Sequence, residues 1–225
     1  MHQAVIQTAF LGDLLLSIPL LRNLKNLTSN SPLVLCCRKG IGSFLLELKL
    51  VDELIEVEKG DSKSYKEASL KIKDYKIENL IVPHQSFRSG LLARSIPAKR
   101  KVSFNQWWAH WFYQKTFVRP MHLPDALRQL TLLKEINAQF DQFLKSIEID
   151  REYFNSSSQE TLDFRNLIID EKLSMSLRKE IETHMGNLSR NTNQIVISPG
   201  SVWNTKMWQT EKFAILTKNL VERGY

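Results

Sequence analysis

Short apolar runs alternate with segments of helical periodicity through the first hundred residues, and this alternation limits the fold more than any other feature of the sequence. The apolar runs are bounded by Gly, Pro or charged residues, which is typical of buried strands, and they lie at Ala4–Ala9, Pro32–Cys37, Glu53–Val57, Asn79–Val82 and Lys101–Phe104. Helices are predicted between them at Asp13–Leu27, Gly42–Leu50, Lys63–Lys73 and Phe87–Ser95. The alternation predicts an α/β fold with a parallel sheet wrapped by helices.

The pattern changes after this region. Leucine and isoleucine at helical spacing predict a helix over Asp125–Asn137. From 138 to 193 the periodicity loosens, with a Ser-rich break at Asn155–Gln159 and a polar helix around Leu173–Met185. We therefore assign residues 1–137 to an N-terminal domain and residues 138–193 to a linker region.

A strand followed by a helix returns near the C-terminus. Gln194–Ser198 predicts a strand, Pro199–Ser201 a turn, and Gln209–Arg223 a helix whose inner face carries Phe213, Leu216 and Leu220. One strand and one helix cannot bury their own apolar faces, because a sheet needs several strands. We expect residues 194–225 to be the incomplete beginning of a second domain.

Composition favours a protein of the cytoplasm. The 225 residues are 43% hydrophobic and 24% charged, which is ordinary for a globular protein. The N-terminal apolar stretch has no Lys or Arg before Arg22 and carries Asp13, so we do not expect a signal peptide. Cys36 and Cys37 are adjacent in an apolar run and cannot join distant parts of the chain, which suits a reducing compartment.

The positive charge of the chain is concentrated in one segment. No acid lies between Glu78 and Asp125, whereas seven basic residues do, and these account for the net charge of +7. The same segment is rich in aromatic residues, and if Asn105–Phe117 is helical, one face carries Trp107, Trp108, Trp111 and Phe112. Such a segment suits a phosphorylated lipid headgroup, a membrane face or nucleic acid. The alternative is a solvated positive face over core aromatics.

Gly12 and Asp13 lie between the first predicted strand and the first predicted helix. Ligands of open α/β sheets bind at the carboxyl ends of strands, so this pair occupies a position where chemistry is usually done. Gly12 permits a tight turn and Asp13 presents a carboxylate. The alternative is that Asp13 serves only as the N-cap of the following helix.

A second candidate site lies in the run S-P-G-S-V-W-N-T-K-M-W, from Ser198 to Trp208, between a predicted strand and a predicted helix. Backbone N–H groups, the hydroxyls of Ser201 and Thr205 and the ammonium of Lys206 could hold a phosphate at the helix N-terminus. Neither a Walker loop nor a G-x-G-x-x-G motif is present. The alternative is a structural turn with Trp208 packed into a core.

Together these motifs resemble glycosyltransferase family 9, the lipopolysaccharide heptosyltransferases. The resemblance rests on L-G-D-L-L-L-S-I-P-L-L-R-N-L at Leu11–Leu24 and on P-G-S-V-W-N-T-K-M-W at Pro199–Trp208. The V-D-E-L-I run at Val51–Ile55 and the P-x-x-S-x-R-S stretch at Pro83–Ser89 are also similar to that family. The resemblance to this family covers Ala4 to about Asn137 and Gln194 to Gly224.

The resemblance implies a GT-B enzyme with two Rossmann-like lobes, the acceptor on the N-terminal lobe and the nucleotide sugar mostly on the C-terminal lobe. It implies an inverting, metal-independent reaction without a cofactor, in which Asp13 is the general base. Lys206, Ser201 and Thr205 would bind the donor diphosphate. On this view the acceptor-binding residues are Gly12, Ser86, Arg88, Arg94, Lys99 and Arg100.

The function expected from this resemblance is transfer of heptose from ADP-heptose to the lipopolysaccharide inner core. The acceptor would be a phosphorylated glycolipid, met at the inner face of the cytoplasmic membrane. The resemblance also implies that most of the C-terminal lobe is missing from this chain, so the alternative is an inactive remnant that binds anionic glycolipids or membrane surfaces. Nucleic-acid binding is not favoured, because the sequence contains no recognised nucleic-acid module.

Overall fold

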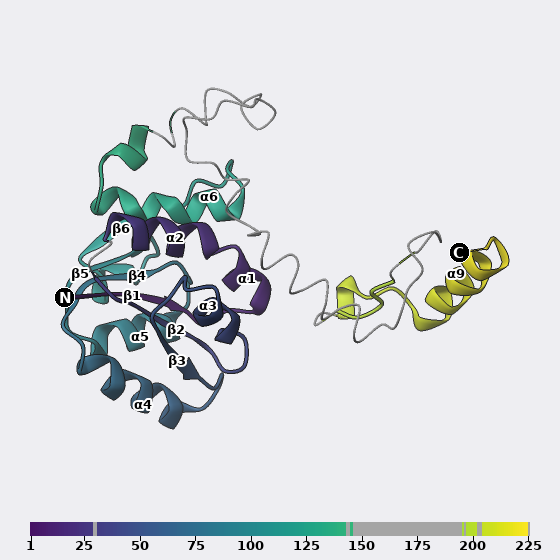
Figure 1. Ribbon diagram of the computed structural model, residues 1–225, viewed down its shortest axis with the longest axis horizontal. Coiled ribbons are helices and arrows are strands. Elements are labelled where there is room, and N and C mark those ends of the chain that lie inside the picture. The colour runs from purple at the N-terminus through teal and green to yellow at the C-terminus, as the bar shows by residue number, and fades with distance from the viewer. Residues whose placement is uncertain (29–30, 143–144, 146–194, 196, 202–203, 225) are drawn as a thin grey trace. The chain divides into compact units, whose positions relative to one another are not determined.

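The computed structural model describes residues 1–28, 31–142, 145, 195, 197–201 and 204–224. The chain divides into two compact units, Met1–Asp170 and Glu171–Tyr225. Figure 1 shows the elements of both units.

The first unit is built on a parallel sheet of six strands. These strands are β1 (His2–Gln7), β2 (Leu33–Arg38), β3 (Glu53–Val57), β4 (Ile77–Val82), β5 (Ala98–Phe104) and β6 (Lys115–Phe117). Their order across the sheet is β3-β2-β1-β4-β5-β6, and every neighbouring pair is parallel. The predicted α/β fold with a parallel sheet is confirmed, and β6 is a strand that the sequence pattern did not predict.

Helices cover both faces of this sheet (Figure 1). One face packs against α1 (Leu11–Leu15), α2 (Ile18–Leu27), α3 (Ser43–Glu47), α6 (Asp125–Leu130) and the 3₁₀ helix η2 (Thr131–Glu135). The other face packs against α4 (Ser62–Lys73), α5 (Phe87–Ser95) and the aromatic segment around the 3₁₀ helix η1 (Ala109–Trp111). Successive strand residues alternate between the two cores, as Cys36 and Cys37 of β2 do, so the two thiols lie on opposite faces.

The strand order reverses between β1 and β4. From β1 the chain moves outward through β2 and β3, and it then returns to the other side of β1 to form β4, β5 and β6. After the carboxyl end of β1 the chain therefore enters a helix on one face of the sheet, and after the carboxyl end of β4 it enters a helix on the opposite face. Such a switch point is where open α/β sheets bind their ligands.

Two helix predictions differ from the structure. The predicted helix Asp13–Leu27 is divided into α1 and α2 at Leu16–Ser17. Pro19 is the cause, because it has no N–H and its ring clashes with the carbonyl four residues earlier, so α1 cannot continue through it. The predicted helix Asp125–Asn137 forms as α6 followed by the tighter turn η2.

The helix considered for Asn105–Phe117 does not form. The segment instead contains η1 and β6, which pairs with β5 through Val102–Lys115, Ser103–Thr116 and Phe104–Phe117. The sheet edge satisfies backbone groups that a helix would have satisfied internally. The aromatic residues consequently divide: Trp108 and Phe112 are buried, whereas Trp107 and Trp111 are 77% and 49% exposed.

The described part of the second unit contains the 3₁₀ helix η5 (Asn204–Lys206) and α9 (Thr210–Glu222). Of the strand predicted at Gln194–Ser198, the described residues 195, 197 and 198 lie in no strand. No partner strand is present in the described part of this unit, and a strand needs a neighbour for its hydrogen bonds. The polar helix predicted at Leu173–Met185 and most of the predicted linker lie outside the described residues.

Candidate active site

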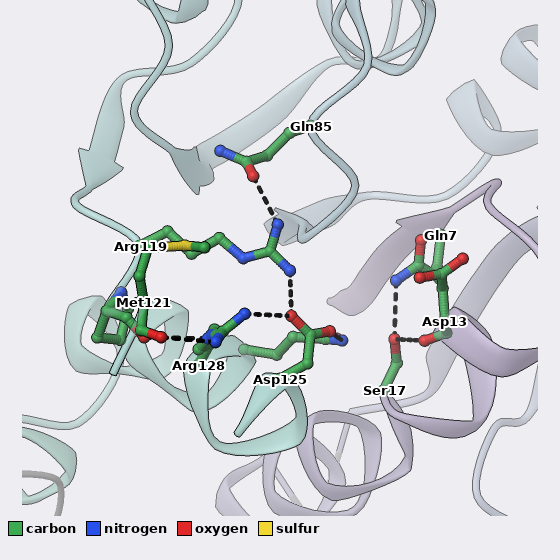
Figure 2. A network of polar contacts seen from close by, with 10 residues as sticks. Gln7, Asp13, Ser17, Gln85, Arg119, Met121, Asp125 and Arg128 are labelled. Carbon is green, nitrogen blue, oxygen red and sulfur yellow. Dashed lines mark hydrogen bonds and ion pairs between the residues drawn. The ribbon is translucent and has the colours of Figure 1, made fainter. Parts of the chain in front are cut away.

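Asp13 lies in the first turn of α1, immediately after β1, and is half-buried. The backbone N–H of Phe10 donates to Asp13 Oδ2 at 3.2 Å, so the carboxylate closes the first turn of the helix from its third position, whereas the sequence alternative placed Asp13 at the N-cap. Behind it, the Ser17 hydroxyl donates to the Asp13 carbonyl at 2.9 Å and accepts from Gln7 Nε2 at 2.9 Å (Figure 2). These contacts fix the backbone that carries Asp13.

Gly12 has a different role from the one expected. It lies within α1 and does not adopt a left-handed backbone, so no tight turn requires glycine here. A Cβ atom added at Gly12 would meet no protein atom within 4 Å. The exposed chain next to Asp13 is therefore open at the Cβ position of Gly12.

A cluster of three side chains joins the carboxyl ends of β1 and β4. The Thr8 hydroxyl lies 3.1 Å from His84 Nδ1 and 3.0 Å from the Ser89 hydroxyl, and Ser89 lies 3.1 Å from the same ring nitrogen. Thr8 and Ser89 are buried and His84 is half-buried. None of the three was predicted from the sequence, because they come together only when β4 pairs with β1.

Charged groups surround this cluster. Burial lowers the pKa of His84; the Asp13 carboxylate raises it, and the Lys59 ammonium lowers it further. Lys59 Nζ lies 4.6 Å from the centre of the Phe10 ring, and the Arg38 guanidinium lies 5.2 Å from it. A carboxylate, an imidazole and two cations thus share one edge of the sheet, and only Asp13 among them is predicted from the sequence.

A second polar network lies at the same edge of the sheet, beyond β4 and β6 (Figure 2). Arg119 Nη1 donates to Gln85 Oε1 at 2.7 Å, and its Nη2 pairs with Asp125 at the start of α6. Arg128 Nη2 donates to the carbonyl of Met121 at 2.7 Å. The network holds the chain after β6 against α6, so Arg119 is a structural cation and not part of a free positive face.

The structure separates the six candidate acceptor residues. Gly12, Ser86 and Arg88 lie at or near the carboxyl edge, and the hydroxyl of Ser86, the N-cap residue of α5, makes no capping hydrogen bond. By contrast, the last turn of α5 and the start of β5 lie at the amino edge of the sheet, and they hold Arg94, Lys99 and Arg100. Arg100 also pairs with Glu78 at 3.5 Å. These two groups do not form one site.

The candidate donor residues belong to the second unit. Thr205 and Lys206 are exposed in η5, and Ser201 is half-buried. Trp208 and Phe213 pack ring to ring at 5.1 Å across the N-cap Gln209, a hydrophobic staple that sets the entry into α9. Trp208 is 46% exposed and α9 has no buried residue, so the expected inner face of this helix is not covered by described residues.

No helix among the described residues is long and apolar enough to cross a membrane. No group of three His, Cys, Asp or Glu side chains among them is placed to hold a metal ion.

The fold is similar to those of solved glycosyltransferases. A glycosyltransferase family 9 protein from Veillonella parvula superimposes with a TM-score of 0.68 at 20% identity, covering 100% of this chain and 61% of that one. E. coli heptosyltransferase WaaC with ADP-2-deoxy-2-fluoro heptose gives 0.66 at 14% identity, covering 100% and 67%. E. coli ADP-heptose lps heptosyltransferase II gives 0.62 at 17%, covering 100% and 62%. The chain thus spans about 61% of the Veillonella protein's length.

No curated protein sequence matches the chain. The sequence model of the family described as glycosyltransferase family 9 (heptosyltransferase) matches residues 67–225, which is more than half of the chain. The match begins within α4, so the Gly12–Asp13 turn lies outside it. The chain belongs to glycosyltransferase family 9.

Proposed function

We propose that this chain is the acceptor lobe, with the start of the donor lobe, of an inverting and metal-independent heptosyltransferase. The observation that carries the proposal is the position of Asp13: a half-buried carboxylate at the switch point of the sheet, with open space beside it at Gly12. A general base must reach the proton that it removes, and this geometry leaves room for an acceptor hydroxyl.

In the proposed reaction, Asp13 accepts the proton of an acceptor hydroxyl as its oxygen attacks the anomeric carbon of the donor sugar. The bond from that carbon to the diphosphate oxygen breaks, and the diphosphate leaves with the bonding electron pair. Attack from the side opposite the leaving group inverts the anomeric configuration. Lys206, with Ser201 and Thr205, is the proposed partner of the diphosphate, because a cation and hydroxyls before a helix N-terminus suit a developing negative charge.

We propose ADP-heptose as the donor and a phosphorylated inner-core glycolipid as the acceptor. Family membership supports a heptosyl donor, and two of the similar structures carry ADP or an ADP-heptose analogue. Arg38 and Lys59 beside Phe10 supply positive charge for the acceptor at the edge that holds Asp13. Arg88 at the start of α5 supplies more.

The proposed location is the inner face of the cytoplasmic membrane. Trp107 and Trp111 contact each other edge to face at 5.6 Å and remain exposed. Exposed tryptophan with nearby basic residues suits the interface of an anionic bilayer.

The test is transfer from ADP-heptose to an inner-core glycolipid that lacks heptose. The release of ADP and the anomeric configuration of the product are measured. The proposed function predicts ADP release that depends on the acceptor, an inverted product and no loss of rate with a metal chelator. Acceptor binding without any turnover would favour the alternative, an anionic-glycolipid binding module.

A further inference from the structure

A groove of about 520 Å³ lies between α4 and α5, away from the contacts that hold Asp13. One face of each helix lines it, with Tyr65, Ser69 and Leu70 from α4 and Leu91 and Leu92 from α5. Gly60–Ser62 after β3 and Arg88 in the first turn of α5 border one end. Because both segments follow carboxyl ends of strands, this end opens at the sheet edge that holds Asp13.

The inside of the groove suits an alkyl chain. Leu70 and Leu91, one on each helix, are 54% and 49% exposed although they line a concave surface. The polar atoms of the floor already have partners: the hydroxyls of Ser69 and Ser95 lie 2.7 Å apart, and Ser95 also donates to the carbonyl of Leu92 at 2.7 Å. The floor therefore does not require a polar ligand, and a chain lying there would remove both leucines from water.

The rim of the groove suits an anion. Lys66, Lys73 and Arg88 line it and are exposed, and none of them pairs with an acid in the part of the chain that the structure describes. The single carboxylate of the rim, Asp61, accepts the backbone N–H of Lys63 at 2.8 Å and so caps α4. Lys66 and Arg88 stand toward the end that opens at the carboxyl edge.

We propose that this groove binds one alkyl chain of an anionic lipid, with the chain between Leu70 and Leu91 and its phosphate at Lys66 and Arg88. The volume is in the range of small-molecule sites. This inference deepens the proposed function, on which it rests for the identity of the lipid: the chain would belong to the glycolipid acceptor, whose sugar end would then face Asp13. Affinity for an anionic alkyl chain follows from the groove alone.

The experiment titrates the chain with dodecyl phosphate below its critical micelle concentration, using isothermal titration calorimetry. Inorganic phosphate and a neutral dodecyl glycoside are titrated in parallel to separate the contributions of the charge and the alkyl chain. The test variants are Leu70→Asn with Leu91→Asn, and Lys66→Gln. Their matched controls are Leu46→Asn, a 37% exposed leucine on α3 at the other face of the sheet, and Lys71→Gln, which is on α4 outside the groove.

We expect dodecyl phosphate to bind more tightly than either parallel ligand. The leucine pair should weaken it about tenfold, and Lys66→Gln should weaken it severalfold, while both controls bind as the wild type does. Thermal unfolding checks that the leucine variant is folded. If the leucine variant is unfolded, the comparison of Lys66→Gln with its control still tests the proposal. Equal affinity for inorganic phosphate, equal affinity of variants and controls, or no binding by the wild type would overturn the proposal.

The measurement uses neither a donor nor turnover. Failure of dodecyl phosphate binding therefore leaves the proposed role of Asp13 untouched. An inactive protein that still binds dodecyl phosphate in the groove would count against the proposed transfer reaction alone.

Discussion

The Thr8 hydroxyl lies 3.1 Å from Nδ1 of His84, and this contact joins the carboxyl ends of β1 and β4 at the point where the strand order reverses. Thr8 immediately follows the strand that leads to Asp13, so the imidazole and the carboxylate share one polar environment. The negative charge of Asp13 raises the pKa of His84, and the positive charge of Lys59 lowers it. This coupling makes His84 a reporter of the charge state of the site.

His84 is therefore expected to titrate below the ordinary histidine value of about 6.5. Burial favours the neutral ring, so the folded protein prefers His84 unprotonated, and this contribution to stability is present above pH 6.5 and is lost as the pH falls through the folded pKa. Asp13→Asn should lower the pKa of His84 further, because it removes the stabilising negative charge. Lys59→Gln should raise it. NMR titration of the imidazole signals, assigned with His84→Gln, measures each shift; a pKa unchanged in both variants would contradict the coupling.

Gly12→Ala is expected to leave the protein folded, and even stabilise it by up to about 1 kcal/mol, because alanine is the better helix former and its Cβ meets no protein atom. The same methyl group would fill the space beside Asp13 and reduce transfer. Gly90→Ala is the contrasting variant: its Cβ would lie 2.7 Å from a ring atom of Phe112, and overpacking should lower stability by about 1–3 kcal/mol. Chemical denaturation measures both. A destabilised Gly12→Ala with normal transfer would show that glycine is needed there for the fold.

Asp52, within the V-D-E-L-I run, is expected to stabilise the fold. Its carboxylate accepts from the backbone N–H of Leu33 and from Lys25 Nζ, each at 2.8 Å, and these hydrogen bonds together with the nearby charges of Lys25 and His2 outweigh burial and lower its pKa. Asp52→Asn should lower the free energy of unfolding by roughly 1 kcal/mol at neutral pH, a figure already reduced for the exposure of the pair. A carboxyl group whose pKa is lowered by folding stabilises the folded protein at pH values above the unfolded pKa of about 3.9. This stabilisation is lost as the pH falls through the folded pKa. Urea denaturation should thus show the two proteins converging at acidic pH, and a constant difference would contradict the account.

Anionic vesicles are expected to retain the protein more than neutral ones, and less as salt rises. Trp107→Ala combined with Trp111→Ala should weaken this binding, because both rings are exposed and neither fills the core. Leu46→Ala, on the other face of the sheet, is the control. Co-sedimentation across a salt series measures the effect. Equal retention of the tryptophan variant and the control would remove this surface from the proposed membrane contact.

Much of the first unit could be predicted from sequence because its strands β1, β2 and β4 are buried on both faces. Residues 33–37 of β2 are all buried, so the strand appears as a continuous apolar run between Pro32 and Arg38. Edge strand β6 has three residues, of which Lys115 is exposed, and no such run marks it. Its aromatic neighbours resemble a helix face, and only pairing with β5 determines their conformation.

The candidate site was predictable only where its residues are local. Asp13 follows a strand directly, and that position alone suggests a role. Thr8 lies 76 residues from His84 and 81 from Ser89, so no spacing rule connects them. Nearness in sequence groups Arg94, Lys99 and Arg100 with Arg88, but the length of α5 carries them to the opposite edge of the sheet.

The role of Asp13 as general base is the central claim, and Asp13→Asn tests it most directly, because the amide oxygen can still accept the Phe10 N–H that closes the first turn of α1. Turnover of ADP-heptose with the glycolipid acceptor is measured in a protein that also contains the donor lobe, together with ADP-heptose affinity. Asp52→Asn is the control, an identical change remote from this edge. We predict that turnover of Asp13→Asn falls by about 10²–10⁴-fold while donor affinity is unchanged. Turnover close to that of the control variant would contradict the account.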